Sequence, residues 1–330
     1  MTQETTRKMV QIGRRTLAGV TAGLLARPAL AAWPDRPVRL IVPIAPGGSN
    51  DLVARLVGAE LANALGQPVV VENRPGGAGQ IGMRAAAQSA PDGHTLILAN
   101  SGAVAITPAM HPQAGYDAVR DFAPISMIME VPIMLVVRHD LPARSVGELI
   151  ALMRRDAHAV TFGSPGAGQT PHLATELFLR AIGVDATIAT YRGAAPAAND
   201  FAAGVTQALF DTSSTLPLVG NQTARILAVT GRSRSALLPQ VPTLRESGID
   251  GMELGSWFVL LAPAGVPPAV LGRLNTLTRA ALAKPEIRER LTSINAEPRP
   301  TGIEDTRSQI AAESAYWQEV IRRTGLTVGN

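Results

Sequence analysis

Apolar runs that suit buried strands alternate along this chain with segments of helical periodicity. Residues 38–45, 69–71 and 95–99 are the first three runs, and helical patterns separate them. Parallel strands buried on both faces have continuous apolar sequences of this kind, and a helix returns the chain to the same end of the sheet. The alternation therefore predicts an α/β fold with a doubly wound, parallel sheet.

A second block repeats this alternation after a long extended segment at residues 122–137. We expect its strands at residues 160–163, 187–191, 207–210 and 226–230. A second extended segment, residues 253–262, leads into a helical C-terminal part. Two blocks joined by two crossings predict two lobes with a hinge and a cleft between them. We assign residues 32–135 and 252–330 to lobe I and residues 136–251 to lobe II.

Local patterns predict where three helices begin and which way one of them faces. Residues 51–65 have a helical pattern whose expected inward side chains are Leu52, Leu56, Ala59 and Leu61. Thr170 is the expected N-cap of a helix with Pro171 at its first position. The run from Thr301 to Glu304 has the sequence of a capping box.

The first 31 residues have the three parts of a secretory signal peptide. Basic residues precede an apolar run at residues 17–26, and Ala29-Leu30-Ala31 offers the small residues that signal peptidase needs. The apolar run is too short to cross a bilayer, which takes about 20 residues. We expect cleavage after Ala31 or Ala32 and a soluble mature chain in the periplasm. Arg14-Arg15 also fits a twin-arginine signal, and both export routes stay open.

Removal of this leader leaves a mature chain without net charge. The leader has five basic residues and one acidic residue, so 25 of the 30 basic and 25 of the 26 acidic residues remain. Such a chain has no cationic excess with which to bind nucleic acid or an anionic membrane surface. The absence of cysteine excludes disulfides, a thiol nucleophile and a lipid-anchoring cysteine.

One motif suggests a dinucleotide site but does not fit it. Residues 77–82 match the pattern G-x-G-x-x-G, yet residues 72–75 lie between the preceding strand and the glycines. A pyrophosphate-binding turn begins where the strand ends. Glycines that let a helix pack closely explain the run better.

The candidate catalytic residues do not lie in any known catalytic sequence motif. Ser49 and Ser164 lie on glycine-rich turns, but neither lies in G-x-S-x-G. The five histidines form neither H-x-x-x-H nor H-E-x-x-H, so we expect no metal, no cofactor and no catalytic residue. His172 alone is near a candidate site, and a structural role at a helix start explains it. A hydrolase or lyase using these residues is therefore disfavoured.

Two glycine-rich turns, one in each block, indicate anion binding. Residues 46–49 and 164–170 each connect a strand to the start of a helix. Backbone N–H groups are unpaired at a helix start, and the helix dipole adds partial positive charge there. Glycine allows close approach, and the hydroxyls of Ser49 and Thr170 add donors.

Several short sequence runs are distributed along almost the whole mature chain: residues 33–37, 41–43, 45–51, 70–77, 91–96, 191–193, 241–243, 256–257 and 262–265. In order and spacing these runs resemble the Bug-type periplasmic solute-binding proteins of tripartite tricarboxylate transporters. The resemblance implies a type II periplasmic-binding fold, with two doubly wound lobes joined by two hinge-crossing segments. It also implies closure of the lobes on a small carboxylate: a di- or tricarboxylate, an acidic amino acid or an aromatic acid.

The resemblance also implies a partner, the membrane permease of a tripartite tricarboxylate transporter, and we expect a monomeric binding protein. A periplasmic sensor that presents the carboxylate to a receptor kinase is the alternative. The family's ligand-binding positions fall on Gly47, Gly48, Ser49, Asp51, Ser101, Gly102, Gly166, Gly168, Gln169, Thr170 and Asp211. Asp211 is expected either to receive an ammonium or hydroxyl group of the ligand or to cap a helix.

Two departures from the family pattern concern the expected site. Ile44 stands where an aromatic residue is usual. In the second glycine-rich turn, Gln169 replaces a short hydroxyl residue and Pro171 removes an N–H donor. Because both changes lie where ligand choice is set, the sequence does not identify the ligand.

Overall fold

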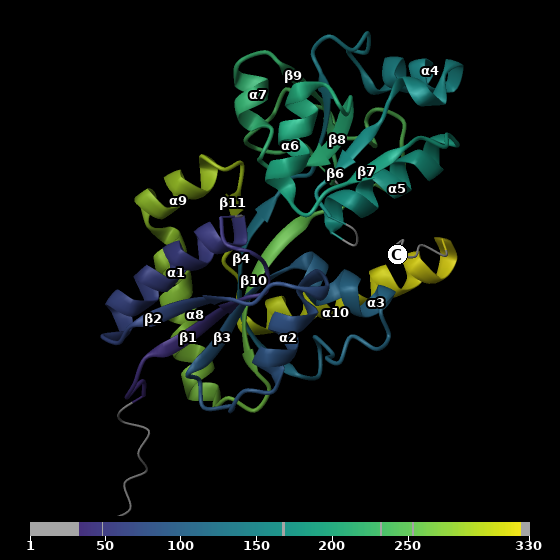
Figure 1. Cartoon of the computed structure of the whole chain (residues 1–330). Coiled ribbons are helices and arrows are strands. Elements are labelled where there is room, and N and C mark those ends of the chain that lie inside the picture. The colour runs from purple at the N-terminus through teal and green to yellow at the C-terminus, as the bar shows by residue number, and fades with distance from the viewer. Residues whose placement is uncertain (1–32, 48, 167–168, 232, 253, 325–330) are drawn as a thin grey trace, which may run out of the picture.

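The computed structural model describes residues 33–47, 49–166, 169–231, 233–252 and 254–324, which form two α/β lobes (Figure 1). The predicted signal peptide, Gly48 and Gly168 lie outside the described residues. Each lobe is built on one sheet, with strand order β11-β4-β10-β3-β1-β2 in lobe I and β7-β6-β8-β5-β9 in lobe II. The fold predicted from the sequence is confirmed.

Lobe I combines parallel and antiparallel strands. Its strands are β1 (Val38–Val42), β2 (Val69–Asn73), β3 (Thr95–Asn100), β4 (Phe122–Val131), β10 (Ser256–Pro263) and β11 (Glu297–Pro298). Its helices are α1 (Ser49–Leu65), η2 (Gly77–Gly79), α2 (Gln80–Ala87), η3 (Gly102–Ile106), α3 (Thr107–Met110), α8 (Pro268–Ala283), α9 (Pro285–Thr292) and α10 (Ile303–Thr324). β1 pairs in parallel with β2 and β3, whereas β10 pairs antiparallel with β3 and β4.

Lobe II repeats this arrangement with shorter strands. Its strands are β5 (Met134–Arg138), β6 (Phe162–Ser164), β7 (Ile188–Thr190), β8 (Ala208–Asp211) and β9 (Ala224–Val229). Its helices are α4 (Val146–Arg155), η4 (Ala157–Ala159), α5 (Thr170–Ile182), α6 (Ala194–Ala203) and α7 (Leu216–Gly220). β6 pairs in parallel with β7 and β8, and β5 pairs antiparallel with β8 and β9.

Two segments carry the chain between the lobes. The first is the extended stretch expected at residues 122–137, which divides into β4 in one sheet and β5 in the other. The second leads from β9 back to β10. The Thr230 N–H donates to the Ile133 carbonyl at 2.8 Å, so the two crossings are hydrogen-bonded to each other. The lobe boundaries at residues 135/136 and 251/252 stay a prediction.

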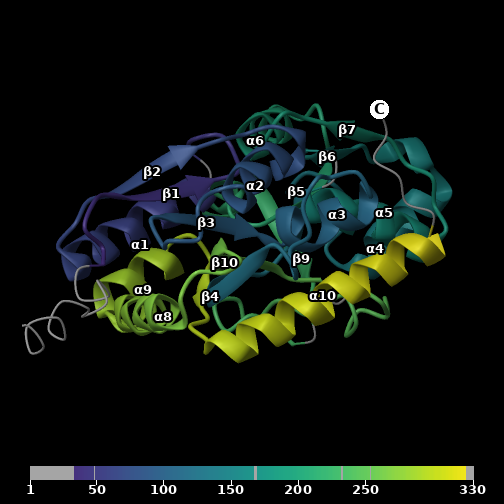
Figure 2. The same ribbon diagram turned by 90° about the horizontal axis from the view of Figure 1, so that it is seen from below.

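Helices cover both faces of the lobe I sheet, because successive side chains of a strand point to opposite faces. Leu40 packs in the cluster that includes Val53 and Leu61 of α1, whereas Ile41 packs with Met83 of α2. α10 lies along the same side as α2 and α3 and extends toward α5 of lobe II (Figure 2).

The inward face of α1 agrees with the prediction at Leu61, which is buried, but differs from it at two other positions. Leu52 is 39% exposed and Ala59 is exposed, while Val53 and Val57 are buried. A Cβ on Gly58 would lie 3.5 Å from both Leu40 Cδ2 and Val69 Cγ1. The helix therefore turns its small Gly58 side toward the sheet, which rotates Leu52 and Ala59 toward solvent.

Two predicted helix starts are also wrong in detail. α5 begins at Thr170 with Gln169 as its N-cap, one residue earlier than expected. At α10, the Thr301 hydroxyl accepts the Met127 N–H at 3.0 Å, so this side chain connects the helix start to β4 in place of forming a capping box. The Thr301 hydroxyl therefore serves a contact outside its own helix.

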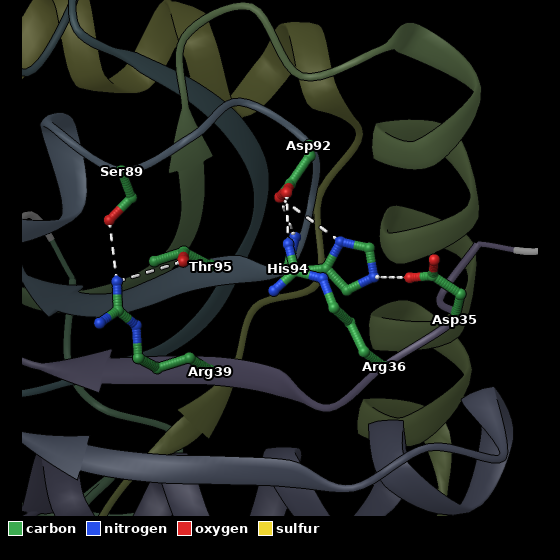
Figure 3. A network of polar contacts seen from close by, with 7 residues as sticks. All are labelled: Asp35, Arg36, Arg39, Ser89, Asp92, His94 and Thr95. Carbon is green, nitrogen blue, oxygen red and sulfur yellow. Dashed lines mark hydrogen bonds and ion pairs between the residues drawn. The ribbon is translucent and has the colours of Figure 1, made fainter.

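A polar network fixes the start of the described chain, as Figure 3 shows. His94 is buried, with Nε2 3.0 Å from Asp35 Oδ1 and Nδ1 3.4 Å from Asp92 Oδ1. Arg36 Nη2 lies 2.6 Å from Asp92 Oδ2. The runs at residues 33–37 and 91–96 therefore contact each other, and they hold the first residues after the expected cleavage site against lobe I.

Candidate functional site

The carboxyl ends of the parallel strands mark one edge of each sheet. β1 and β3 end at Val42 and Asn100 in lobe I, and β6 and β8 end at Ser164 and Asp211 in lobe II. Open α/β sheets bind ligands outside this edge, where loops lead from strand to helix. Those predicted ligand-binding positions that the structure describes lie at these strand ends, in the turns after them, or in the first turn of the helix that follows.

Side chains from the two edges touch each other. Ser101 follows β3 and Thr170 opens α5, and their hydroxyl oxygens lie 3.2 Å apart, with exposed fractions of 0% and 2%. Next to them, Asn100 Nδ2 donates to Gln169 Oε1 at 3.4 Å. The predicted residues Ser101, Gln169 and Thr170 therefore meet at the boundary between the lobes.

Gly102 lies in the same group. A Cβ built on Gly102 would lie 3.5 Å from Gln169 Oε1, which is ordinary van der Waals contact. Gly166 belongs to the turn that leads into α5, and its φ of +147° is unusual for residues with a side chain. The Gly166 carbonyl accepts the Gln169 N–H at 3.2 Å, which closes the turn.

The turn after β1 is organised by Asp51. The Gly47 N–H donates to Asp51 Oδ2 at 3.1 Å, and the Arg55 guanidinium contacts both carboxylate oxygens at 3.1 and 3.0 Å. Burial favours the neutral acid, but the hydrogen bonds from Arg55 and Gly47 outweigh it and hold the pKa of Asp51 below its usual value. Asp51 thus has protein partners of its own. Ser49 is the first residue of α1.

Asp211 is hydrogen-bonded to the turn that follows β8. Its Oδ2 accepts the Thr215 N–H and the Thr215 hydroxyl, both at 2.7 Å, and its Oδ1 accepts the Ser214 hydroxyl at 2.7 Å. The carboxylate is buried and fixes the turn between β8 and α7. These contacts give Asp211 a structural role in the turn before α7, whose N-cap is Thr215, and its expected contact with a ligand stays a prediction.

Two buried polar groups at the strand ends lack partners. Asn50 Nδ2, in the first turn of α1, and Ser164 Oγ, at the end of β6, make no hydrogen bond within the described chain. Buried polar groups are nearly always paired, so such groups indicate a position where a ligand or a water completes the site. Sequence reasoning did not select Asn50 or Asn100, and it placed Ser164 in an anion-binding turn without naming it as a ligand-binding residue. The signal that could have found them is their position, because Asn100 and Ser164 end strands and Asn50 lies at the start of the helix after β1.

His172 does not form a catalytic pair among the described residues. It is buried in α5, and its Nδ1 lacks a hydrogen-bond partner there. Burial lowers the pKa of His172, and the nearby Glu176 carboxylate offsets this only in part. The ring is therefore neutral near pH 7.

The glycines at residues 77–82 pack against protein. A Cβ on Gly82 would lie 2.7 Å from Pro43 Cα, and one on Gly79 would lie 2.8 Å from Ala103 Cβ. These close approaches hold η2 and α2 against the turn after β1 and against η3, so they explain why small residues stand there. Within the described ranges, no group of three His, Cys, Asp or Glu side chains is placed to hold a metal ion. None of the described helices is long and apolar enough to cross a membrane.

This architecture, two α/β lobes that meet through strand-end loops, is that of a periplasmic binding protein, and comparisons with known proteins agree. Residues 53–326 match the tripartite tricarboxylate transporter family receptor model. Protein BugT of Bordetella pertussis is 36% identical over 92% of this chain and 94% of its own length. The chain therefore belongs to this receptor family.

Solved structures have the same fold. An R. palustris protein with adipate superposes with a TM-score of 0.82 at 36% identity, covering 89% of this chain and 99% of that one. MatC from Rhodopseudomonas palustris with bound malate superposes with a TM-score of 0.79 at 31% identity, covering 87% of this chain and 99% of the other.

Proposed function

We propose that this protein captures a small carboxylate between its two lobes and delivers it to the permease of a tripartite tricarboxylate transporter. In this proposal the chain is exported to the periplasm by its N-terminal leader and makes or breaks no covalent bond. The ligand is bound by the strand-end loops, at Gly47, Gly48, Ser49, Ser101, Gly102, Gly166, Gly168, Gln169 and Thr170. Asp51 and Asp211 do not bind the ligand in this proposal but hold the loops in position through the hydrogen bonds described above.

The contact between Ser101 and Thr170 is the observation that carries the proposal. Two buried hydroxyls, one from each lobe, lie 3.2 Å apart at the ends of strands where α/β proteins bind ligands. A carboxylate placed beside both hydroxyls would accept a hydrogen bond from each lobe and so favour the closed arrangement. The unpartnered Asn50 Nδ2 and Ser164 Oγ are further donors at the same strand ends.

Neutral donors are sufficient for such a site. A hydrogen bond to a charged group contributes about 1.5–3 kcal/mol, and micromolar affinity requires about −8 kcal/mol. The start of α5 adds partial positive charge from the helix dipole. A few such donors therefore balance one carboxylate without an arginine or lysine in the binding set.

Related proteins support the choice of ligand class. The similar structures described above contain adipate and malate, which are both small dicarboxylates. The proposal extends this ligand class to the present chain. Gln169, however, differs from the residue expected in the family's second glycine-rich turn. We therefore propose a dicarboxylate and do not choose among its members.

Calorimetric titration of the mature chain with adipate and malate tests the proposal. Thr170→Val removes the hydroxyl at the lobe boundary, and we expect it to weaken binding at least tenfold. Thr276→Val is the matched control, because Thr276 lies on the exposed side of α8. Equal affinity for Thr170→Val, Thr276→Val and the unchanged chain would show that the site lies elsewhere.

A further inference from the structure

Lobe II has a hollow of about 520 Å³ that none of the predicted ligand-binding residues lines. His139, Arg144, Ser145, Val146, Arg225 and Val241 are among its lining residues. Two arginines and a histidine lie in its wall, and none of the lining residues is acidic. The hollow is therefore a concentration of positive charge on a chain whose mature form is neutral overall.

The hollow lies along β9, the edge strand of the lobe II sheet, and it extends to the start of this strand, which is remote from lobe I. β9 begins at Ala224, opposite Arg138, and it ends at Val229, opposite Met134. Met134 follows the crossing from lobe I, so the start of β9 is the remote end. At about 3.3 Å per residue, roughly 16 Å of strand separates the two ends. Residues 224–227 of β9 line the hollow, and lobe I contributes none of its lining residues.

Arg225 carries a positive charge that no carboxylate of the described chain neutralises. Its Nη2 donates to the His139 carbonyl at 2.7 Å, which fixes the guanidinium against the start of the strand. Its Nε is buried without a hydrogen-bond acceptor among the described residues. A partly buried, fixed and unpaired cation of this kind attracts an anion, because less water screens it than at an exposed surface.

Arg144 adds a second cation at the rim. Its guanidinium is exposed and forms no ion pair with a described residue, whereas its backbone N–H donates to Glu148 Oε2 at 2.7 Å. Glu148 lies in the first turn of α4, and its carboxylate is held by that backbone bond. The Arg144 side chain therefore remains available to a bound anion.

The N-terminus of α4 also adds partial positive charge to the hollow. Ser145 caps this ten-residue helix by accepting the Glu148 N–H at 3.2 Å, and Ser145 and Val146 both line the hollow. The positive end of the helix dipole thus lies beside the two arginines. Apolar side chains of Val146, Val219 and Val241 form the other walls, and they suit a carbon skeleton.

We propose that this hollow is a second ligand site, which binds a small organic dianion between Arg144 and Arg225. The two guanidinium groups receive the charged ends, and the valine walls contact the carbons between them. The site is independent of the proposed function, because one lobe alone forms it. Binding here neither requires nor promotes lobe closure, and it weakens with salt more steeply than binding to the neutral donors between the lobes.

Glutarate is a suitable probe, because it is a dianion with a short apolar chain. We would titrate it by calorimetry at low salt into a Ser101→Asp background, in which a carboxylate repels anions from the strand-end loops. The uncharged diamide of glutarate serves as the ligand control. Circular dichroism and the melting temperature establish that each variant is folded.

The decisive comparison uses two double variants with the same change of charge. Arg144→Gln/Arg225→Gln removes both cations of the hollow, and Arg288→Gln/Arg290→Gln removes two exposed cations of α9. We expect the first pair to weaken glutarate binding at least tenfold and the second to leave it unchanged. Equal binding by both, or no binding of glutarate in the background itself, overturns the proposal. Thr170→Val tests the site between the lobes separately, so failure of one site is distinguishable from failure of the other.

Discussion

Asn100 and Gln169 belong to different lobes, and the Asn100 side-chain amide donates to the Gln169 side-chain oxygen at 3.4 Å. The bond lies beside the Ser101–Thr170 contact, so two polar pairs connect the lobes at the strand ends. Gln169 is also the position where this chain departs from the usual family loop. The amide of Gln169 is longer than the side chain of serine or threonine, so it reaches a partner that those shorter residues would not.

Replacement of Gln169 by serine should therefore open the ligand-free protein. A neutral hydrogen bond contributes about 0.5–1.5 kcal/mol, so its loss reduces the closed population up to about tenfold. Small-angle X-ray scattering of the ligand-free mature chain should give a larger radius of gyration for Gln169→Ser. Gln318→Ser, on the exposed side of α10, is the control and should leave the radius unchanged. An unchanged radius in Gln169→Ser would mean that this bond does not hold the lobes.

Asp51 should stabilise the fold in a pH-dependent way. Its pKa in the folded protein is lowered from 3.8, so its ionised form contributes stability above that pH and loses it as the pH falls through the folded pKa. Asp51→Asn should lower the free energy of unfolding by about 1–2 kcal/mol at pH 7, because it removes charge-assisted hydrogen bonds from Gly47 and Arg55.

Urea unfolding at pH 7 and near pH 2.5 measures this difference. The gap between Asp51→Asn and the unchanged chain should be largest at pH 7 and should narrow in acid. Asp185→Asn, at an exposed carboxylate, gives the baseline at both values. A gap that is the same at both pH values would exclude an ionised Asp51 as its source.

Gly82 should tolerate no larger residue. A Cβ there would lie 2.7 Å from the backbone Cα of Pro43, which cannot move without moving the turn after β1. We expect Gly82→Ala to destabilise by about 1–3 kcal/mol despite the better helix propensity of alanine. Gly272→Ala, in α8, has open space around its Cβ and should stabilise by up to about 1 kcal/mol. Thermal unfolding of both variants checks the prediction, and a stabilised Gly82→Ala would contradict the close approach.

Asp211 should act on stability more than on ligand choice. Its carboxylate accepts three hydrogen bonds from Ser214 and Thr215, so Asp211→Ala leaves buried donors without acceptors and should cost about 2–4 kcal/mol. If Asp211 only shapes the turn, the ratio of affinities for malate and for an amino-bearing acid such as aspartate should stay constant in this variant. A selective loss of aspartate binding would instead assign the carboxylate a direct contact with the ammonium group.

The strands and turns were predictable because they depend on short stretches of sequence. The apolar run that became β1 begins at its expected residue, and the glycine-rich turn before α5 leads into a helix at Thr170, within one residue of its expected start. The face of α1 was not predictable, because it depends on the contact of Gly58 with Leu40 and Val69, which come from other parts of the chain. For the same reason the sequence predicted Gln169 as a site residue but not its partner Asn100.

The hydrogen bond from Thr230 to Ile133 has a mechanical consequence. Two independent linkers would let one half of the molecule twist, slide and tilt against the other. Linkers tied side by side act as a single axis, which leaves rotation about that axis as the easy motion. Each time the lobes close by this rotation, the same residues of the two lobes come together. The ligand is therefore always contacted by the same set of residues.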